Sequence, residues 1–252
     1  MKILVIGDIY GKKGLDALKK FLPEIKRDTN YHLLIVNGEN LADGLGIREA
    51  DYKELMNLGV HAVTLGNHSF SKQELFTFIN DANIVRPANY PEKTPGKSVL
   101  MINFNDKKIA VINIMGQIFM HDPLSDPFTT LDQLLETVEA DEIIVDVHAE
   151  ATSEKLAIAH YLDGRVTAVL GTHTHVQTND AMTLPKGTLY ITDLGMTGSK
   201  YGILGADKDL VMERFLTKMP VRLRPHKGKE LQLNGVLLDL VQKRINIIHK
   251  SD

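Results

Sequence analysis

Short apolar runs rich in isoleucine and valine recur along the chain, and most of them end at Gly, Asp, Asn or His. Within each run the apolar residues are continuous rather than alternating with polar ones, which is typical of strands covered on both faces of a sheet. The pattern therefore predicts seven buried strands, at Ile3–Ile6, Leu33–Val36, Ala62–Leu65, Ile109–Ile114, Ile143–Val147, Val166–Leu170 and Leu189–Ile191.

Five candidate helices lie between these runs, and the first two have apolar residues at clear helical spacing. Ser153 is a suitable N-cap for the last helix, and Gly164 follows that helix as a C-terminal stop. Alternation of strands and helices predicts a layered α/β fold. The predicted helices are Leu15–Lys26, Arg48–Leu58, Lys72–Asn80, Thr130–Glu139 and Ser153–Asp163.

The C-terminal part does not follow this alternation of strands and helices. Leu231–Leu240 and Lys243–Ile248 are predicted strands with no helix between them, and we expect them in a mixed sheet packed against the first. The proline-rich segment Pro87–Gly96 predicts one loop. No repeat, low-complexity tract or linker divides the chain, so we expect a single domain over residues 1–252.

Composition is that of an ordinary globular protein, with 43% apolar and 24% charged residues. Cysteine is absent, which excludes disulfides and thiolate metal ligands and fits a reducing compartment. The apolar stretch Ile3–Ile6 is too short for the core of a signal peptide, and no later run approaches the ~20 residues of a membrane span. We therefore expect a cytoplasmic protein that does not enter a membrane.

The net charge of −3 gives no support for tight, non-specific binding to nucleic acid. The densest basic stretch, Arg214–Lys229, has no acidic residue and one aromatic residue, Phe215, and it is a candidate rim for a small phosphate ligand. The segment Arg214–Arg222 is also a candidate for contact with a second subunit, which leaves a homo-oligomer open.

Polar residues follow directly after five of the apolar runs. Because ligands bind at the carboxyl ends of strands in layered α/β folds, these segments converge on one pocket if their strands share a sheet edge. The segments are Gly7-Asp8 with Tyr10-Gly11, Gly38-Glu39-Asn40, Gly66-Asn67-His68, Val147-His148 and Gly171-Thr172-His173-Thr174-His175.

The side chains of these segments suit a pair of transition-metal ions. A single Asp, Asn or His of this kind is more often a turn, cap or structural residue, but five such segments in chain order make that interpretation unattractive. The mixture of carboxylate, amide and imidazole ligands leaves Fe, Mn and Zn open. The candidate ligands are Asp8, Glu39, Asn40, Asn67, His148, His173 and His175.

The ordered set of GD, GEN, GNH, H and GxHxH motifs resembles the calcineurin-like metallophosphoesterases. It is most similar to their YmdB-like branch, which has a similar GDIxG start and carries GEN where most of the superfamily has GDxxD. The similarity extends nearly end to end and includes Tyr190–Gly198. Compared with the broad superfamily, Tyr10 replaces a histidine and Glu39 replaces the bridging aspartate, and whether Asp43 orients His68 is left open.

This resemblance implies a four-layer α/β/β/α sandwich with mixed sheets and hydrolysis of 2′,3′-cyclic nucleotides or related phosphodiesters. It implies two metal ions, Fe or Mn, and the ligand types leave Zn open as the alternative. His68 would stay off the metals and face the substrate. The first metal would be held by Asp8, Glu39, Asn40 and His175, and the second by Glu39, Asn67, His148 and His173.

In the expected mechanism a metal-bridging hydroxide attacks phosphorus in line, and His68 protonates the leaving alkoxide. Two other functions stay open. One is a phosphomonoesterase that acts on a nucleotide or a phosphoprotein. The other is a metal-stabilised signalling or RNA-associated binding protein with weak hydrolysis, against which the near-neutral charge and the complete set of ligands count.

Overall fold

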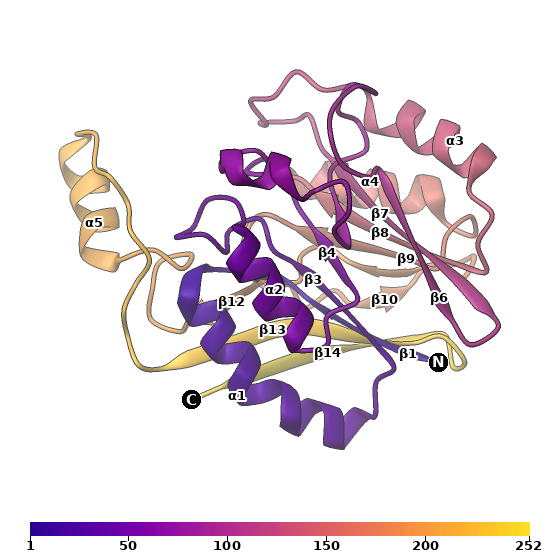
Figure 1. Cartoon of the computed structure of the whole chain (residues 1–252), viewed down its shortest axis with the longest axis horizontal. Coiled ribbons are helices and arrows are strands. Elements are labelled where there is room, and N and C mark those ends of the chain that lie inside the picture. Colours follow the sequence, from indigo (N-terminus) through magenta and orange to yellow (C-terminus); the bar gives the residue numbers. More distant parts are fainter.

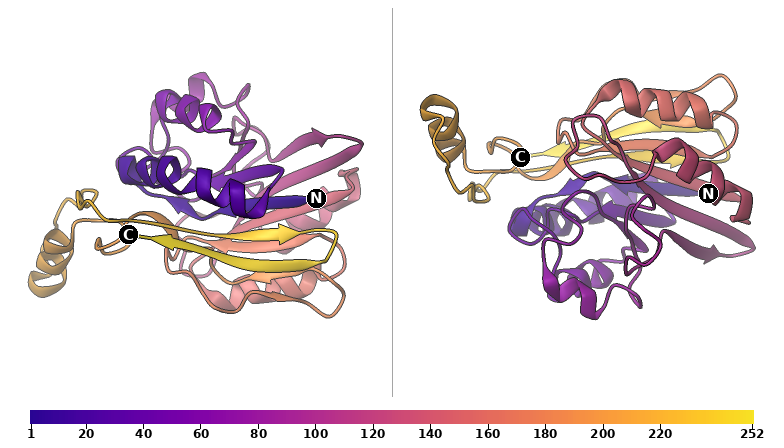
Figure 2. Two further views of the ribbon diagram at one scale, coloured as in Figure 1. Left: turned by 90° about the horizontal axis from the view of Figure 1, so that it is seen from below. Right: turned by 90° about the horizontal axis from the view of Figure 1, so that it is seen from above.

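Two β-sheets stack face to face, and helices cover the outer face of each (Figures 1 and 2). This computed structural model describes residues 1–252. The first sheet has the order β2 (Asp8–Ile9), β12 (Met196–Ser199), β13 (Leu231–Asp239), β1 (Lys2–Ile6), β3 (Leu33–Asn37), β4 (Ala62–Thr64) and β5 (Ile84–Val85), and β14 (Arg244–Ser251) pairs with β13. The second has the order β10 (Met182–Thr183), β11 (Leu189–Ile191), β9 (Ala168–Thr172), β8 (Glu142–His148), β7 (Lys107–Met115) and β6 (Val99–Phe104).

Three separate hydrophobic clusters fill the spaces between the four layers. In β1, Leu4 and Ile6 belong to the cluster under α1 (Gly11–Thr29) and α2 (Glu49–Asn57), whereas Ile3 and Val5 belong to the cluster between the sheets. A third cluster joins the second sheet to α3 (Pro127–Thr137) and α4 (Thr152–Leu162). The predicted α/β/β/α sandwich is therefore confirmed, and strands buried on both faces explain the continuous apolar runs.

Within each sheet, most strands that precede the candidate ligands are parallel to one another. The first sheet pairs β1, β3, β4 and β5 in parallel, and the second pairs β7, β8, β9 and β11 in parallel. Parallel strands end at the same edge of a sheet, so the polar segments that follow β3, β4, β8 and β9 are delivered to one side of the molecule.

The expectation of a separate C-terminal sheet is wrong. β13 pairs antiparallel with β1, from Lys2↔Asp239 to Ile6↔Gly235, and it therefore lies inside the first sheet. Its apolar residues face both ways: Leu233 packs in the cluster under the helices and Val236 in the cluster between the sheets. A strand with two apolar faces can take a central position, which the hydrophobic pattern alone does not assign to a particular sheet.

One predicted helix and one predicted helix cap differ from the structure, and one predicted helix end agrees with it. Lys72–Asn80 is not an α-helix but contains only the short 3₁₀ helix η1 (Gln73–Thr77), because a segment this short depends on tertiary packing rather than on helix propensity. Ser153 is not the N-cap of α4, since Ala151 takes that place without a side-chain cap. The C-terminal stop is confirmed, because Gly164 has a positive φ of 81° just beyond the helix.

The helix α5 (Lys208–Thr217) was not predicted. Only Val211 of this helix is buried, so its sequence lacks a broad apolar stripe. Figures 1 and 2 show α5 and the chain that follows it extending away from the two sheets. No helix in the structure combines the length and the apolar character that crossing a bilayer requires.

Candidate metal centre

All seven candidate ligands come together where the edges of the two sheets meet. The first sheet and the loops that follow its strands supply Asp8, Glu39, Asn40 and Asn67, and the second sheet supplies His148, His173 and His175 in the same way. The contacts among these side chains divide them into two groups that touch each other.

One group centres on Nε2 of His148, which is fully buried. This nitrogen lies 3.3 Å from Oε1 of Glu39, 2.9 Å from Oδ1 of Asn67 and 3.0 Å from Nδ1 of His173. Glu39, His148 and His173 place their donor atoms close enough together to hold one metal ion. Gly66 makes this approach possible, since a Cβ at that position would lie 2.4 Å from both Glu39 Oε2 and His148 Nε2.

The other group centres on His175, whose Nε2 lies 3.1 Å from Oδ1 of Asn40 and 3.7 Å from Oδ1 of Asp8. Asp8 is fully buried, and its Oδ1 has no hydrogen-bond partner in the protein. A buried carboxylate oxygen without a partner is unfavourable unless a cation compensates it. The second oxygen of Asp8 accepts from the backbone N–H of His173 at 3.2 Å, which joins the two groups.

Hydrogen bonds behind the imidazoles determine which nitrogen faces the centre. Thr172 donates to Asp146 at 2.6 Å, so its hydroxyl oxygen accepts from Nδ1 of His148 at 2.9 Å. Nδ1 of His175 donates to the carbonyl of Leu204 at 3.0 Å. In the neutral imidazoles Nδ1 therefore carries the proton, and Nε2 of each ring has a lone pair that faces oxygen acceptors. Lone pairs that face each other repel, and a cation bound between them would remove that repulsion. The residues fit the binding of divalent metal.

The titration of the buried groups shows the same demand for positive charge. Burial raises the pKa of Asp8 to about 6. Burial opposes the protonated form of His148, but the charge and hydrogen bond of Glu39 outweigh it and raise the pKa of His148 to about 9. Burial likewise opposes the ionisation of Glu39, and the charge of His148 prevails, which lowers the pKa of Glu39 to about 2. In the absence of metal, protons supply part of the charge that the carboxylates require.

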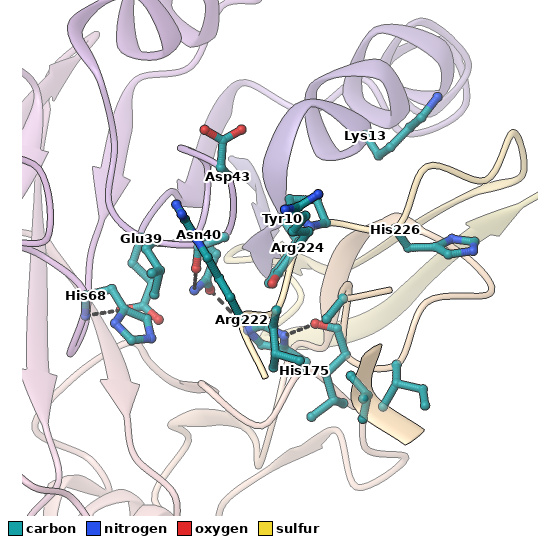
Figure 3. A pocket seen from close by; sticks show the side chains of 18 of the residues that line it. Tyr10, Lys13, Glu39, Asn40, Asp43, His68, His175, Arg222, Arg224 and His226 are labelled. Carbon is teal, nitrogen blue, oxygen red and sulfur yellow. Dashed lines mark hydrogen bonds between the residues drawn. The ribbon is translucent and has the colours of Figure 1, made fainter. Parts of the chain in front are cut away.

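His68 lies beside this centre, and its ring has a different set of contacts. Asn67 points its Oδ1 toward His148 and its Nδ2 toward Nε2 of His68, at 3.3 Å. The backbone N–H of His68 donates to Oε2 of Glu39 at 2.9 Å, a contact visible in Figure 3. Burial lowers the pKa of His68, so the ring can give up a proton readily. The ring is therefore placed next to the ligands without belonging to either group.

Asp43 does not contact His68. Its carboxylate forms an ion pair with Arg48 and is largely exposed. Among the charges that influence the pKa of His68, the nearby negative ones are Glu39 and Asp122. Tyr10 packs edge-on against His175 with ring centroids 5.7 Å apart.

A buried ion pair supports the loop that carries the two histidines. Lys155 is fully buried, and its Nζ donates to the carbonyl of Thr172 at 2.6 Å and to Oδ2 of Asp193 at 2.7 Å. Asp193 in turn accepts from the N–H and the hydroxyl of Thr174 at 3.1 and 2.8 Å. The pair holds the residues on either side of His173, which has a φ of 96°, a strained value for a residue other than glycine.

Sequence reasoning missed several residues that support the centre. Asp146 is the one charged residue within the run Ile143–Val147, and a buried charge two residues before a histidine is a signal that could have been used. Glu150 could not be found in that way, since it lies in a loop and reaches Nε2 of His173 at 3.1 Å. Lys155 and Asp193 are far apart in sequence, and only the fold brings them together.

Comparison with known proteins gives the family. The profile of the YmdB-like protein family matches residues 4–250. The chain belongs to the YmdB-like family. A 2′,3′-cyclic-nucleotide 2′-phosphodiesterase of Bacillus subtilis (strain 168) is 49% identical over 243 residues, covering 95% of this chain and 91% of that protein.

Two solved structures have the same architecture as this chain. A protein of Thermus thermophilus, described as hypothetical, superimposes with a TM-score of 0.95 at 45% identity, covering 100% of both chains. A structure from Mycoplasma pneumoniae, described as a novel phosphatase, gives a TM-score of 0.92 at 35% identity, covering 100% of this chain and 93% of the other. The likeness to these two structures extends over both sheets and therefore over both halves of the candidate centre.

Proposed function

We propose that this protein is a di-metal phosphodiesterase that hydrolyses 2′,3′-cyclic nucleotides or related phosphodiesters. The observation that carries the proposal is the pair of imidazole Nε2 atoms, of His148 and His175, that face carboxylate and amide oxygens beside the unpartnered Oδ1 of Asp8. The name of the Bacillus subtilis relative supports the choice of substrate. Because both sheets supply ligands, we also propose that residues 1–252 act as one domain.

The proposed ligand groups follow the contacts. Asp8, Asn40 and His175 would hold one ion, and Asn67, His148 and His173 would hold the other. Glu39 has one oxygen 3.3 Å from Nε2 of His148 and directly precedes Asn40 in the chain, so it would contribute to holding both ions. We propose Fe or Mn, with Zn as the alternative, because the mixed set of oxygen and nitrogen ligands suits these metals.

When bound, two divalent ions polarise the phosphoryl oxygens and lower the pKa of coordinated water. Side chains of this protein would position the substrate and transfer the proton. His68 is adjacent to Glu39 and Asn67 and lines the cleft that opens from the centre. We assign to its imidazole the proton that the leaving oxygen needs, a role that requires the ring to lie within hydrogen-bond reach of that oxygen.

The test combines metal analysis with two classes of substrate. We expect purified protein to contain Fe or Mn and to hydrolyse 2′,3′-cyclic AMP and bis-p-nitrophenyl phosphate faster than p-nitrophenyl phosphate. Faster turnover of the mono-ester would instead indicate a phosphomonoesterase. No metal and no turnover, even after Mn²⁺ is supplied, would overturn the enzyme assignment.

A further inference from the structure

The metal centre opens into a cleft of about 1940 Å³. Ligand pockets for small molecules are about 300–1,000 Å³, so this cleft is larger than a single nucleotide needs. One wall is formed by the loops that carry Glu39, His68 and His175, and the other by the segment of residues 208–227, which we call the arm. Figure 3 shows Arg222 and Arg224 of the arm in the same cleft as His68 and His175.

The walls of the cleft carry an excess of positive charge that the whole chain does not have. Nine lysine and arginine side chains line it against four carboxylates, one of which is the candidate ligand Glu39, whereas the chain has a net charge of −3. Only Lys13 and Arg48 among the nine form ion pairs, with Asp16 and Asp43. Unpaired cations gathered in one cleft are typical of a site for a ligand with several negative charges.

These unpaired cations are spread along the cleft rather than gathered at one point. They occur on α1, in the loop after β4 and at five positions of the arm. A single phosphate at the metal centre would reach few of them, whereas a ligand with phosphates at intervals would contact several. The seven are Lys12, Lys72, Arg214, Lys218, Arg222, Arg224 and Lys227.

Apolar side chains line the same cleft as these charges. Phe215 and Leu204 line the cleft and are 64% and 50% exposed, and Ile203 lies beside them. Sites for single-stranded nucleic acid combine a positive groove that follows the backbone with exposed aromatic and apolar faces on which bases stack. The cleft has both components, whereas an inorganic polyphosphate would need only the charges.

We infer that the substrate is the end of a short single-stranded RNA that terminates in a 2′,3′-cyclic phosphate, with the cyclic phosphate at the metal centre and the preceding phosphates on the arm. This inference rests on the proposed function, since a cyclic phosphate of this kind forms only on ribose. In the reaction, the oxygen of water bonds to phosphorus, one of the two bonds from phosphorus to a ribose oxygen breaks, and the proton lost by water is balanced by the proton that the released ribose oxygen takes up. The reaction that supplies the substrate is an RNA cleavage that leaves a cyclic phosphate at the 3′ end.

The first measurement compares two substrates of the whole protein, adenosine 2′,3′-cyclic phosphate and a tetraadenylate that ends in a 2′,3′-cyclic phosphate. We expect kcat/KM to be at least about tenfold higher for the tetranucleotide, the change that one additional charge-assisted contact gives. The tetranucleotide alone should also show a steep salt dependence, with a slope of log kcat/KM against log salt steeper by about 0.7 for each phosphate contact. Equal kcat/KM and equal slopes would overturn the inference.

Variants of the arm test where the RNA lies. Arg222→Ala and Arg224→Ala should each reduce the ratio of tetranucleotide to mononucleotide kcat/KM several-fold. Arg244→Ala is the matched control, because Arg244 is exposed on β14 and does not line the cleft. All three side chains are exposed, so the variants should fold. A ratio that falls equally in the control variant, or in none, would contradict the placement.

A binding measurement separates this inference from the proposed function. A fluorescent tetraadenylate with a 3′-phosphate is titrated with protein, and we expect binding that weakens with salt and in Arg222→Ala. Binding of this kind without any hydrolysis would overturn the proposed function and leave the RNA site standing. Hydrolysis of the mononucleotide without such binding would support the proposed function and overturn the RNA site. Displacement of the RNA by an aspartate peptide of equal charge would show that the cleft does not select RNA.

Discussion

A single hydroxyl separates the carboxylate of Asp146 from the imidazole of His148. Thr172 donates to Asp146 and accepts from His148, while Asn37 and Thr64 of the first sheet donate to the same carboxylate. Burial raises the pKa of Asp146, and these hydrogen bonds oppose that effect by stabilising the charged form. The chain of contacts fixes the tautomer in which Nε2 of His148 is free to bind a cation.

Replacing Thr172 by valine should weaken metal binding. The valine removes the hydroxyl that holds Nδ1 of His148, and losing a partner of this kind lowers metal affinity by about 10–100-fold. Titration of the metal-free protein with Mn²⁺ against a chelating dye measures the change. Thr172→Ser restores the hydroxyl and should retain most of the affinity. Equal affinities for the valine and serine variants would show that the hydroxyl does not orient the imidazole.

His68 and His148 should respond differently to replacement by alanine. His68→Ala removes a side chain that lies beside the ligands, so the protein should keep its metal while turnover falls about 10²–10⁴-fold, the contribution typical of a general acid. His148→Ala and Asn67→Ala remove proposed ligands and should lose metal. Metal content by elemental analysis and turnover of the bis-ester distinguish the two classes. A fully active His68→Ala would remove His68 from the mechanism.

At the scale of elements, α4 contacts and stabilises the loop after β9. Lys155 on α4 is fully buried and is satisfied by Asp193 and by the carbonyl of Thr172. A buried pair contributes little compared with well-packed apolar residues, but removal of one partner leaves an uncompensated charge. Stability and the shape of the candidate centre therefore depend on the same contact.

Lys155→Met should destabilise the fold by about 3–5 kcal/mol, because Asp193 is left charged and buried. Urea denaturation measures the loss, and metal affinity should fall with it because the loop around His173 is released. Lys19→Met is the matched control, since the Lys19–Glu54 pair is on the surface and its loss should change stability by at most about 1 kcal/mol. Similar effects of the two replacements would contradict the role assigned to Lys155.

Local patterns identified the longer buried strands from continuous apolar runs, and most helices from apolar residues at helical spacing. The short buried strands β2, β5 and β12 were not predicted. These patterns failed where contacts with the rest of the protein determine the local structure. The segment Lys72–Asn80 has the composition of a helix but contains only η1, and α5 has too few buried residues to give a pattern. The seven candidate ligands were recognisable because each follows an apolar run, whereas Lys155 and Asp193 give no local signal.

At the scale of the whole molecule, the candidate centre joins the two sheets. Asp8, Glu39 and Asn67 belong to the first half of the sandwich, and His148 and His173 belong to the second. Bound metal would therefore act as a crosslink between the layers, in addition to the apolar cluster that lies between them. Removal of the metal would leave Asp8 and Glu39 buried with their charge only partly compensated.

Chelation of the metal should lower the thermal stability of the protein. A ligand present at about 100 times its Kd stabilises the folded state by about 2.7 kcal/mol, which corresponds to roughly 5–10 °C for a protein of this size. Thermal unfolding with and without EDTA measures the shift, and added Mn²⁺ should reverse it. His148→Ala should not respond to either reagent. An unchanged Tm of the wild-type protein would show that the ions do not stabilise the sandwich.

The position of β13 has a consequence for how the protein is made. β1 leaves the ribosome well before Leu231–Asp239, the segment that forms one of its two neighbours in the sheet. Until that segment emerges, one edge of β1 has unpaired backbone groups, and such edges favour association with other chains. The strand β12, which pairs with Asp8–Ile9, also arrives late. Asp8 can therefore reach its final position only after β12 has emerged, and an ion that Asp8 helps to hold would be bound after that point.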